Sequence, residues 1–244
     1  MCGRFRQTRS QKQLEEAFEG RFDMLPEELT FENLKIAPHY NVAPSQNIVI
    51  VRQERSQPAR RLSFMRWGLV PHWAKELKVG YKNINARAET AATTPAFRDA
   101  FKSQRCLIPA DGFYEWQKNG TTKQPYIFEI AKDEPFAFAG LWDKWRQPGE
   151  SVIESCTILT TRPNELVSGI HDRMPVILNP GDYDLWLDPA FRNAEDLTAM
   201  LQPFPAERMR RHAVSARVND PKNDDPECAK PFEPRLASSQ APLF

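Results

Sequence analysis

The residue with the most distinctive chemistry in this chain is Cys2, which directly follows the initiator Met1. Aminopeptidase normally removes Met1 when the next side chain is small, so the mature chain would begin with an amine and a thiol on adjacent carbons. An α-amine has a pKa of about 7.7–8.0 and a thiol one of about 8.5, so both groups are partly reactive near neutral pH. Such a 1,2-aminothiol can form an imine with an aldehyde and close into a thiazolidine, or it can attack an acyl group. The alternative is a small structural cysteine.

Two further residues could move protons. Glu115 lies between aromatic residues, and burial among them would raise its pKa into the range that suits proton transfer. His171 is one of only four histidines and precedes Asp172 and Arg173, which makes it an acid–base candidate. The alternatives are a glutamate on a solvated strand edge and a hydrogen-bonded structural histidine.

Polar, cationic and aromatic side chains suggest a binding surface around these groups. Asn85 and Arg87 alternate on an extended segment, so we expect both to lie on one face. Asparagine can orient an amine, and the forked donors of arginine suit a phosphate. Trp67, Trp73 and Trp116 interleave with Arg4, Arg66, Arg87 and Arg173. This combination is typical of a groove for single-stranded nucleic acid, although each residue could instead belong to the core or the general surface.

Composition narrows the class of protein. The chain has 244 residues, 41% of them hydrophobic, which is enough for one large domain or two small ones. The formal net charge is only +1, so any nucleic-acid site must be a local patch. No apolar run reaches the length of a membrane span, and no hydrophobic leader is visible. We therefore expect a cytoplasmic protein, or a nuclear one in a eukaryotic host.

The cysteines argue against a metal or a disulfide framework. Cys2, Cys106, Cys156 and Cys228 are widely spaced, and none forms a CxxC pair. Cys106 and Cys156 lie in apolar, strand-like runs and are expected to be reduced core residues. We expect neither a bound metal nor a cofactor.

The pattern along the chain predicts the elements that must position these residues. A helix is expected from Ser10 to Phe18 with Ser10 as N-cap, and residues 20–46, with three prolines, are expected to be loop. Strands are expected at Asn47–Arg52, Ser63–Val70, Arg105–Pro109, Pro125–Ile130, Ala137–Trp142, Glu154–Thr161, Pro175–Leu178 and Arg211–Ser215. Helices are expected near Pro95–Phe101, Asp182–Leu187 and Glu195–Leu201. This order favours one α+β domain on a mixed or antiparallel β core, followed by a loose tail over residues 231–244.

Taken together, these segments resemble the SRAP family (SOS-response-associated peptidase), whose members process abasic sites. The resemblance spans about residues 1–220 and rests on motifs in one order: Met1-Cys-Gly-Arg-Phe5, Asn41-Val-Ala-Pro44, Arg66-Trp-Gly-Leu-Val-Pro71, Asn85-Ala-Arg-Ala-Glu-Thr90, Ala110-Asp-Gly-Phe-Tyr-Glu-Trp116, His171-Asp-Arg-Met-Pro175, and Ala213-Val-Ser215 with Val218-Asn219. Several widely spaced motifs in a fixed order are more specific than any one of them.

The resemblance implies a fold and a set of roles. The fold would be a single α+β domain over residues 1–230, with a distorted barrel-like β core and flanking helices. The partner would be single-stranded DNA containing abasic sites, bound by a monomer that is nucleoid-associated when on DNA. The active-site positions would be Cys2, Asn85, Glu115 and His171. The DNA-binding positions would be Arg4, Asn41, Pro44, Trp67, Trp73, Arg87, Trp116 and Arg173.

The expected mechanism follows from aldehyde chemistry. The Cys2 amine would attack the open-chain sugar while Asn85 holds it, Glu115 would shuttle protons, and the thiolate would close the thiazolidine. His171 would assist opening of the sugar ring. Strand cleavage by β-elimination and self-processing that removes Met1 are further expected activities, although ordinary aminopeptidase would suffice for Met1.

Two other functions remain open from the sequence. One is an N-terminal-nucleophile amidohydrolase, such as a glutaminase domain, which also starts with Met-Cys-Gly. The other is a non-catalytic reader of modified single-stranded DNA in which Cys2 is structural.

Overall fold

The computed structural model describes residues 2–23, 38–146, 149 and 151–233. Its strands are β1 (Phe5–Gln7), β2 (Gly20–Phe22), β3 (His39–Val42), β4 (Asn47–Glu54), β5 (Gln57–Trp67), β6 (Asn85–Arg87), β7 (Arg105–Ala110), β8 (Gly112–Asn119), β9 (Thr122–Ile130), β10 (Phe136–Trp145), β11 (Ile153–Thr161), β12 (Met174–Pro175), β13 (Ile177–Leu178) and β14 (Met209–Ala213).

The helices are short and connect or cover the strands. The α-helices are α1 (Gln11–Ala17), α3 (Ala88–Ala91), α4 (Arg98–Ser103), α5 (Glu165–Ser168), α6 (Tyr183–Leu187) and α7 (Ala194–Ala199). The 3₁₀ turns are η1 (Leu77–Lys82), η2 (Pro180–Asp182), η3 (Ala206–Arg208), η4 (Ala216–Asn219) and η5 (Pro226–Cys228).

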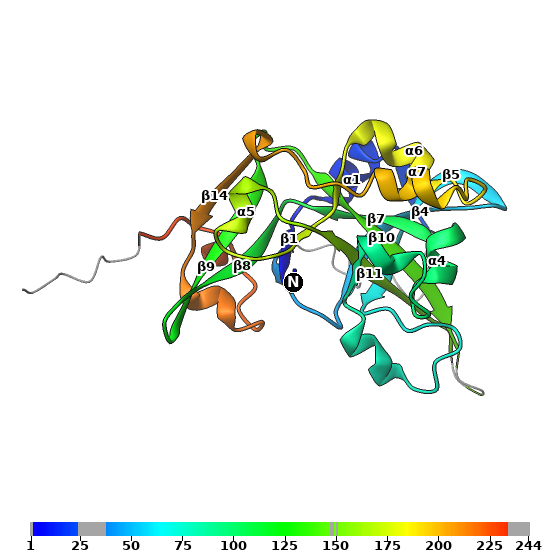
Figure 1. Cartoon of the computed structure of the whole chain (residues 1–244), viewed down its shortest axis with the longest axis horizontal. Helices are drawn as coiled ribbons and strands as arrows, with labels where there is room; N and C mark the ends of the chain where they lie inside the picture. The colour runs from blue at the N-terminus through cyan, green and yellow to red at the C-terminus, as the bar shows by residue number, and fades with distance from the viewer. Residues whose placement is uncertain (1, 24–37, 147–148, 150, 234–244) are drawn as a thin grey trace, which may run out of the picture.

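Five strands close into a mixed barrel, as the sequence predicted. β4 pairs antiparallel with β5 and β7, β7 pairs with β10, and β10 pairs with β11. β11 then returns beside β5 in parallel, with Ser155 opposite Arg66 and Cys156 opposite Trp67. Closing the ring leaves these five strands without a free edge, and Figure 1 shows the barrel on the right of the molecule.

The barrel strands are buried on both faces, which explains their unbroken apolar runs. In β4, Val49 and Val51 belong to a core cluster beneath α1, α4, α6 and α7. The alternate residues Ile48 and Ile50 belong to a second cluster that contains Cys2 and side chains of β1, β8 and β9. Each buried aliphatic side chain contributes about 1.5–3 kcal/mol, so the two clusters hold the helices and the second sheet against the barrel.

The second sheet is antiparallel and fixes the start of the chain. Its order is β14-β9-β8-β1-β3, and in Figure 1 it lies on the left. Phe5 of β1 is opposite Phe113 of β8 on one side and Val42 of β3 on the other. Because β1 is paired on both sides, the residues just before it are held inside the fold and do not trail from it.

The predicted helix at the N-terminus is confirmed. α1 begins after Ser10, whose side chain accepts a hydrogen bond from the Gln13 amide, and the Gln13 side chain bonds back to the Ser10 backbone. This reciprocal capping satisfies donors that a helix start otherwise leaves without partners. Leu14 on its buried face packs into the core.

Several expected boundaries are wrong. The region expected to be loop contains β2 and β3, whereas residues 24–37 lie outside the described residues. β5 starts earlier than expected and ends at Trp67, because Gly68 turns the chain at a φ of 125°. The strand expected at 175–178 is split into β12 and β13, which pair with β11 and β10 respectively. Of the expected tail, residues 234–244 lie outside the described residues, and Pro231 still pairs with Val214.

Candidate active site around Cys2

The N-terminal segment carries Cys2 into the second core cluster. Its side chain is fully buried there, close to Phe5 and Trp67, whose rings meet edge to face at 5.2 Å. The Asn85 side chain donates a hydrogen bond from Nδ2 to the Cys2 carbonyl oxygen at 2.8 Å. Asn85 Oδ1 is buried and has no hydrogen-bond partner among the described residues. The predicted pairing of Cys2 with Asn85 is therefore a direct contact, with one acceptor atom of Asn85 still available.

Asn85 is held in place by strand pairing and by contacts of the residues that precede it. β6 runs parallel to β11, with Asn85 opposite Ile158. The preceding carbonyl, of Ile84, accepts a hydrogen bond from the Trp67 indole at 2.8 Å. Before that, η1 approaches the turn at Gly68 so closely that a Cβ on Gly80 would lie 2.5 Å from the Gly68 oxygen. Two glycines are thus needed for the approach that positions Asn85.

Glu115 lies inside β8, not after a strand as expected. The pairing of β8 with β1 and β9 leaves its side chain only 3% exposed. Burial disfavours the charged form and raises the pKa of Glu115 to about 7. The solvated strand-edge alternative is therefore wrong, and the carboxyl can both give and take a proton near neutral pH.

His171 lies beside Glu115 at the end of the segment that follows α5. Its Nε2 is 3.9 Å from Glu115 Oε2, just beyond hydrogen-bonding distance. Its Nδ1 is 3.0 Å from the Arg173 amide nitrogen and 3.0 Å from Asp172 Oδ1. Burial lowers the pKa of His171. These contacts within the loop fix Nδ1 of the His171 ring, so that Nε2 on the opposite side of the ring is directed toward Glu115.

The environment keeps the resting thiol protonated. Burial raises the pKa of the Cys2 thiol far above its ordinary value, and the neighbouring Glu115 carboxyl raises it further. A reaction through sulfur therefore needs a nearby proton acceptor, and the Glu115 carboxyl is the neighbouring ionisable group that can serve as one. All four predicted catalytic residues lie in one group, joined by the Asn85–Cys2 hydrogen bond and the Glu115–His171 approach.

The residues predicted to bind DNA do not form one surface. Trp67 is fully buried, with its indole nitrogen bonded to Ile84, so it cannot stack on a base in this structure and serves as core beneath Cys2. Asn41 is also fully buried: its Nδ2 donates to the carbonyls of Val218, Asp220 and Asn223. Asn41 is therefore a structural clamp on the C-terminal turns and not a DNA contact.

Arg4 and Trp116 bind the same C-terminal turns. The Arg4 guanidinium donates to Asn41 Oδ1 and to the Val218 carbonyl, each at 2.8 Å. The Trp116 indole donates to Asn219 Oδ1 at 2.7 Å, and its ring packs on a small cluster around Tyr114. These C-terminal partners lie 214 residues from Arg4 and 103 residues from Trp116 along the chain, so they could not have been read from the local motifs.

Arg173 is already paired. Its two terminal nitrogens meet both carboxylate oxygens of Glu89 at 2.7 and 2.8 Å, and Nη2 also donates to the Thr160 carbonyl at 2.6 Å. Sequence reasoning placed Glu89 in a motif but gave it no role. The Arg173 Nε is buried and has no hydrogen-bond partner among the described residues.

Arg87 of β6 and two aromatic side chains of the segment that precedes β6 are open to solvent. Arg87 is exposed, and Trp73 keeps 53% of its surface exposed. Tyr81, which sequence reasoning missed, is 61% exposed, and the Arg66 guanidinium lies 5.7 Å from its ring centre. Its signal in the sequence is an aromatic residue within a lysine-rich stretch four residues before Asn85. Pro44 is half-buried at the start of the turn after β3.

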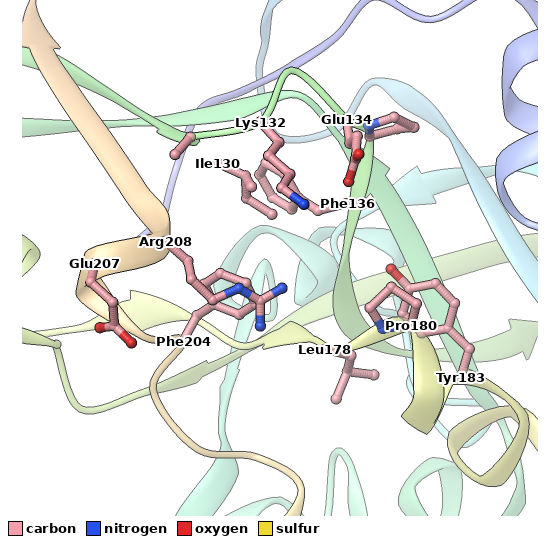
Figure 2. A pocket seen from close by; sticks show the side chains of 12 residues that line it. Ile130, Lys132, Glu134, Phe136, Leu178, Pro180, Tyr183, Phe204, Glu207 and Arg208 are labelled. Carbon is pink, nitrogen blue, oxygen red and sulfur yellow. The ribbon is translucent and has the colours of Figure 1, made fainter.

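A separate cavity contains none of the predicted site residues. It has a volume of about 270 Å³, and Figure 2 shows Phe136, Tyr183 and Phe204 around it, with the Lys132 and Arg208 cations directed into it. Arg208 lies 4.5 Å from the Phe204 ring centre and donates to Asn179. The candidate chemistry around Cys2 therefore lies elsewhere. In the part of the chain that the structure describes, no cluster of three metal-ligating side chains occurs, and no helix is long and apolar enough to span a membrane.

Comparison with known proteins connects this geometry to one family. A sequence model of the SOS response associated peptidase (SRAP) family matches residues 1–221. The abasic site processing protein YoqW of Bacillus subtilis (strain 168) is 46% identical over 232 residues, covering 93% of this chain and 98% of that protein. The abasic site processing protein HMCES of Gallus gallus is 36% identical, covering 80% of this chain and 67% of its own length.

A solved structure shares the fold. The crystal structure of a protein from Bacteroides thetaiotaomicron superposes with a TM-score of 0.79 at 26% identity, covering 94% of this chain and all of that one. The predicted α+β domain with a barrel-like core is confirmed by this likeness and by the closed ring of strands.

Proposed function

Because the chain belongs to the SOS response associated peptidase (SRAP) family, we propose that it recognises abasic sites in single-stranded DNA and shields them through a covalent bond to Cys2. The observation that carries this proposal is the Asn85 bond to the Cys2 backbone beside a buried glutamate whose pKa is about 7. The names of the relatives YoqW and HMCES support abasic-site processing as the activity.

The reaction begins once Met1 is removed. The Cys2 α-amine attacks the open-chain aldehyde of the abasic sugar and forms a carbinolamine. Asn85 Oδ1, buried and without a partner among the described residues, accepts a hydrogen bond from this amine and orients its lone pair. Glu115 in its protonated form gives a proton to the departing hydroxyl, so that water leaves and a protonated imine forms.

Ring closure then completes the adduct. Glu115, now ionised, takes the thiol proton and so regains its protonated form, and the sulfur adds to the carbon of the protonated imine, whose nitrogen keeps its own proton. The product is a thiazolidine, and the overall change is the loss of one water molecule. His171, with Nε2 3.9 Å from the Glu115 carboxyl, assists opening of the closed sugar before attack. A carboxyl with a pKa near 7 suits both halves of this cycle.

Single-stranded DNA would approach along the exposed aromatic and cationic side chains near β6. Trp73 and Tyr81 present faces for base stacking, and Arg87 and Arg66 present cations for the backbone. These contacts carry no base-specific pattern, so we propose binding that is independent of sequence.

Two subsidiary activities belong to the same site. β-Elimination from an imine would cleave the DNA strand, and formation of the thiazolidine removes that imine, so we propose that lyase activity is weak in the intact protein. Self-processing would remove Met1 through the same buried acid. Complete loss of Met1 in a Glu115→Ala protein made in cells without methionine aminopeptidase would contradict self-processing.

The test uses protein whose Met1 removal has been confirmed by intact mass. It is incubated with single-stranded DNA carrying one abasic site, beside intact DNA and beside Cys2→Ala, and resolved on a denaturing gel. We expect a shifted band that needs the abasic site and survives heating only with Cys2, since Cys2→Ala can form only an imine. A Cys2→Ala band as durable as wild type would exclude the thiazolidine. The absence of any adduct, with release of ammonia from glutamine, would favour the amidohydrolase alternative.

A further inference from the structure

The ion pair between Glu89 and Arg173 connects two segments that carry catalytic groups. Glu89 lies in α3, which directly follows β6, and β6 carries Asn85. Arg173 lies two residues beyond His171, and its amide nitrogen is 3.0 Å from His171 Nδ1. The side chains of Glu89 and Arg173 therefore join the segment that carries Asn85 to the loop that carries His171.

Both segments meet at one residue of the barrel wall. Thr160 of β11 is opposite Arg87 of β6 and opposite Pro175 of β12. The Thr160 carbonyl accepts from Arg173 Nη2 at 2.6 Å, while Glu89 holds the same guanidinium from the other side. Arg173 is thus fixed between a rigid strand and the β6–α3 connection, with its side chain only 15% exposed.

The geometry of the pair suits positioning. Two parallel hydrogen bonds, at 2.7 and 2.8 Å, fix both the distance and the angle between a carboxylate and a guanidinium. The Glu89 side chain is 51% exposed, whereas the Arg173 side chain is only 15% exposed, so Glu89 also supplies a counter-charge to a largely buried guanidinium. Measuring the crosslinking rate beside the stability separates this structural contribution from positioning.

We infer that Glu89 is a positioning residue that, by fixing Arg173, sets the separation of His171 from Asn85 and Cys2. This inference rests on the proposed function. It implies that Arg173 acts within the active-site scaffold, while the exposed Arg87 is available to backbone phosphates. Glu89 itself touches no reacting atom.

The experiment compares Glu89→Gln with wild type and with Glu195→Gln. Glu195 is a matched control, because it is an exposed glutamate in the first turn of another short helix, α7. The measurements are the single-turnover rate of crosslinking at saturating abasic DNA, the final yield of adduct, and the affinity for intact single-stranded DNA. Glu89→Asp, which keeps the charge but shortens the reach, is a second variant should Glu89→Gln fold poorly.

We expect Glu89→Gln to slow crosslinking roughly 10- to 100-fold, the scale of a small misplacement of catalytic groups. The final adduct yield and the affinity for intact DNA should stay within about twofold, and the Tm within roughly 4 °C. Glu89→Asp should slow the reaction in the same direction, and Glu195→Gln should match wild type.

Two results would overturn the inference. An unchanged rate would show that the pair positions nothing. Tighter binding of intact DNA with a steeper salt dependence and an undiminished rate would show that Glu89 instead occupies a phosphate position on Arg173. Failure of the proposed function itself looks different, since wild-type protein would then form no adduct at all.

Discussion

Glu115 is a carboxyl group in a position that disfavours its charge. At low pH it is protonated in both the folded and the unfolded chain, so its burial costs nothing. As the pH rises above its ordinary pKa of 4.5, the unfolded chain ionises while the folded one does not until about pH 7. The folded state therefore loses stability across this window, by about 3 kcal/mol in total at about 1.4 kcal/mol per pKa unit.

The first prediction follows from that sign. Glu115→Gln removes the titration, so it should match wild-type stability at pH 4.5 and exceed it by about 3 kcal/mol at pH 8. Urea unfolding at several pH values would measure this difference. Crosslinking should be abolished at every pH, because an amide cannot exchange the proton. A stability difference that is the same at pH 4.5 and pH 8 would show that Glu115 ionises normally.

At the residue scale, types and motifs singled out Cys2, Asn85, Glu115 and His171 because each has distinctive chemistry in its local context. The structure brings these four residues together, and their catalytic roles stay a prediction. The binding residues were harder, since a tryptophan beside an arginine reads the same in a core and on a surface. Trp67 is buried and Trp73 is exposed, and the turn at Gly68 lies between them in the chain. That turn depends on a contact with Gly80. Reactive residues could be identified from short motifs, whereas the solvent exposure of a side chain depends on contacts with distant parts of the chain.

At the element scale, the approach of η1 to the turn after β5 decides where β6 lies. Gly68 has a φ of 125°, and a Cβ there would lie 2.7 Å from the Gly80 oxygen. Helices and most strands were predictable because their apolar patterns are local. The parallel pairings of β11 with β5 and β6 were not, because nothing in short segments records a partner 70 or more residues away.

The second prediction concerns Gly80. Gly80→Ala would place a Cβ against the Gly68 oxygen and force η1 away from the barrel. We expect a loss of about 1–3 kcal/mol of stability, together with slower crosslinking because Asn85 moves with η1. Gly181→Ala is the control, because a Cβ there meets nothing within 4 Å. Equal crosslinking rates for the two variants would show that η1 does not position Asn85.

The third prediction concerns the clamp formed by Asn41. Asn41→Ala removes the amide nitrogen that donates to three carbonyls in the turns at residues 218–223 and leaves the Arg4 guanidinium without one acceptor. Unsatisfied buried groups should destabilise the fold by about 2–3 kcal/mol and open η4 and η5 to proteases. Limited proteolysis with mass spectrometry would locate the cuts. Weaker DNA binding without new proteolytic cuts would show that Asn41 contacts DNA after all.

At the scale of the whole molecule, a net charge of +1 means that attraction to DNA must be local. The fourth prediction is that Arg87→Ala lowers the slope of log affinity against log salt by about 0.7, the effect of one phosphate contact on a single strand. Titrations of intact single-stranded DNA at several salt concentrations give the slope. Arg98→Ala, an exposed arginine on α4, should leave it unchanged.

The fifth prediction separates stacking from charge. Tyr81→Ala and Trp73→Ala should each weaken binding by about 1–3 kcal/mol while leaving the salt slope unchanged, because stacking releases no counterions. The same titrations measure both quantities. Wild-type affinity in both variants would place the DNA on another face.

The burial of every cysteine has a consequence for survival under oxidative stress. Cys2, Cys106, Cys156 and Cys228 are all free, and burial raises the pKa of each thiol. Peroxide attacks thiolates, so a protein that holds its thiols protonated and covered should form sulfenic acid very slowly. Agents that oxidise DNA also create lesions, and a covered Cys2 would stay unoxidised while those agents are present. The cysteine is thereby stored in reduced form until a substrate reaches it.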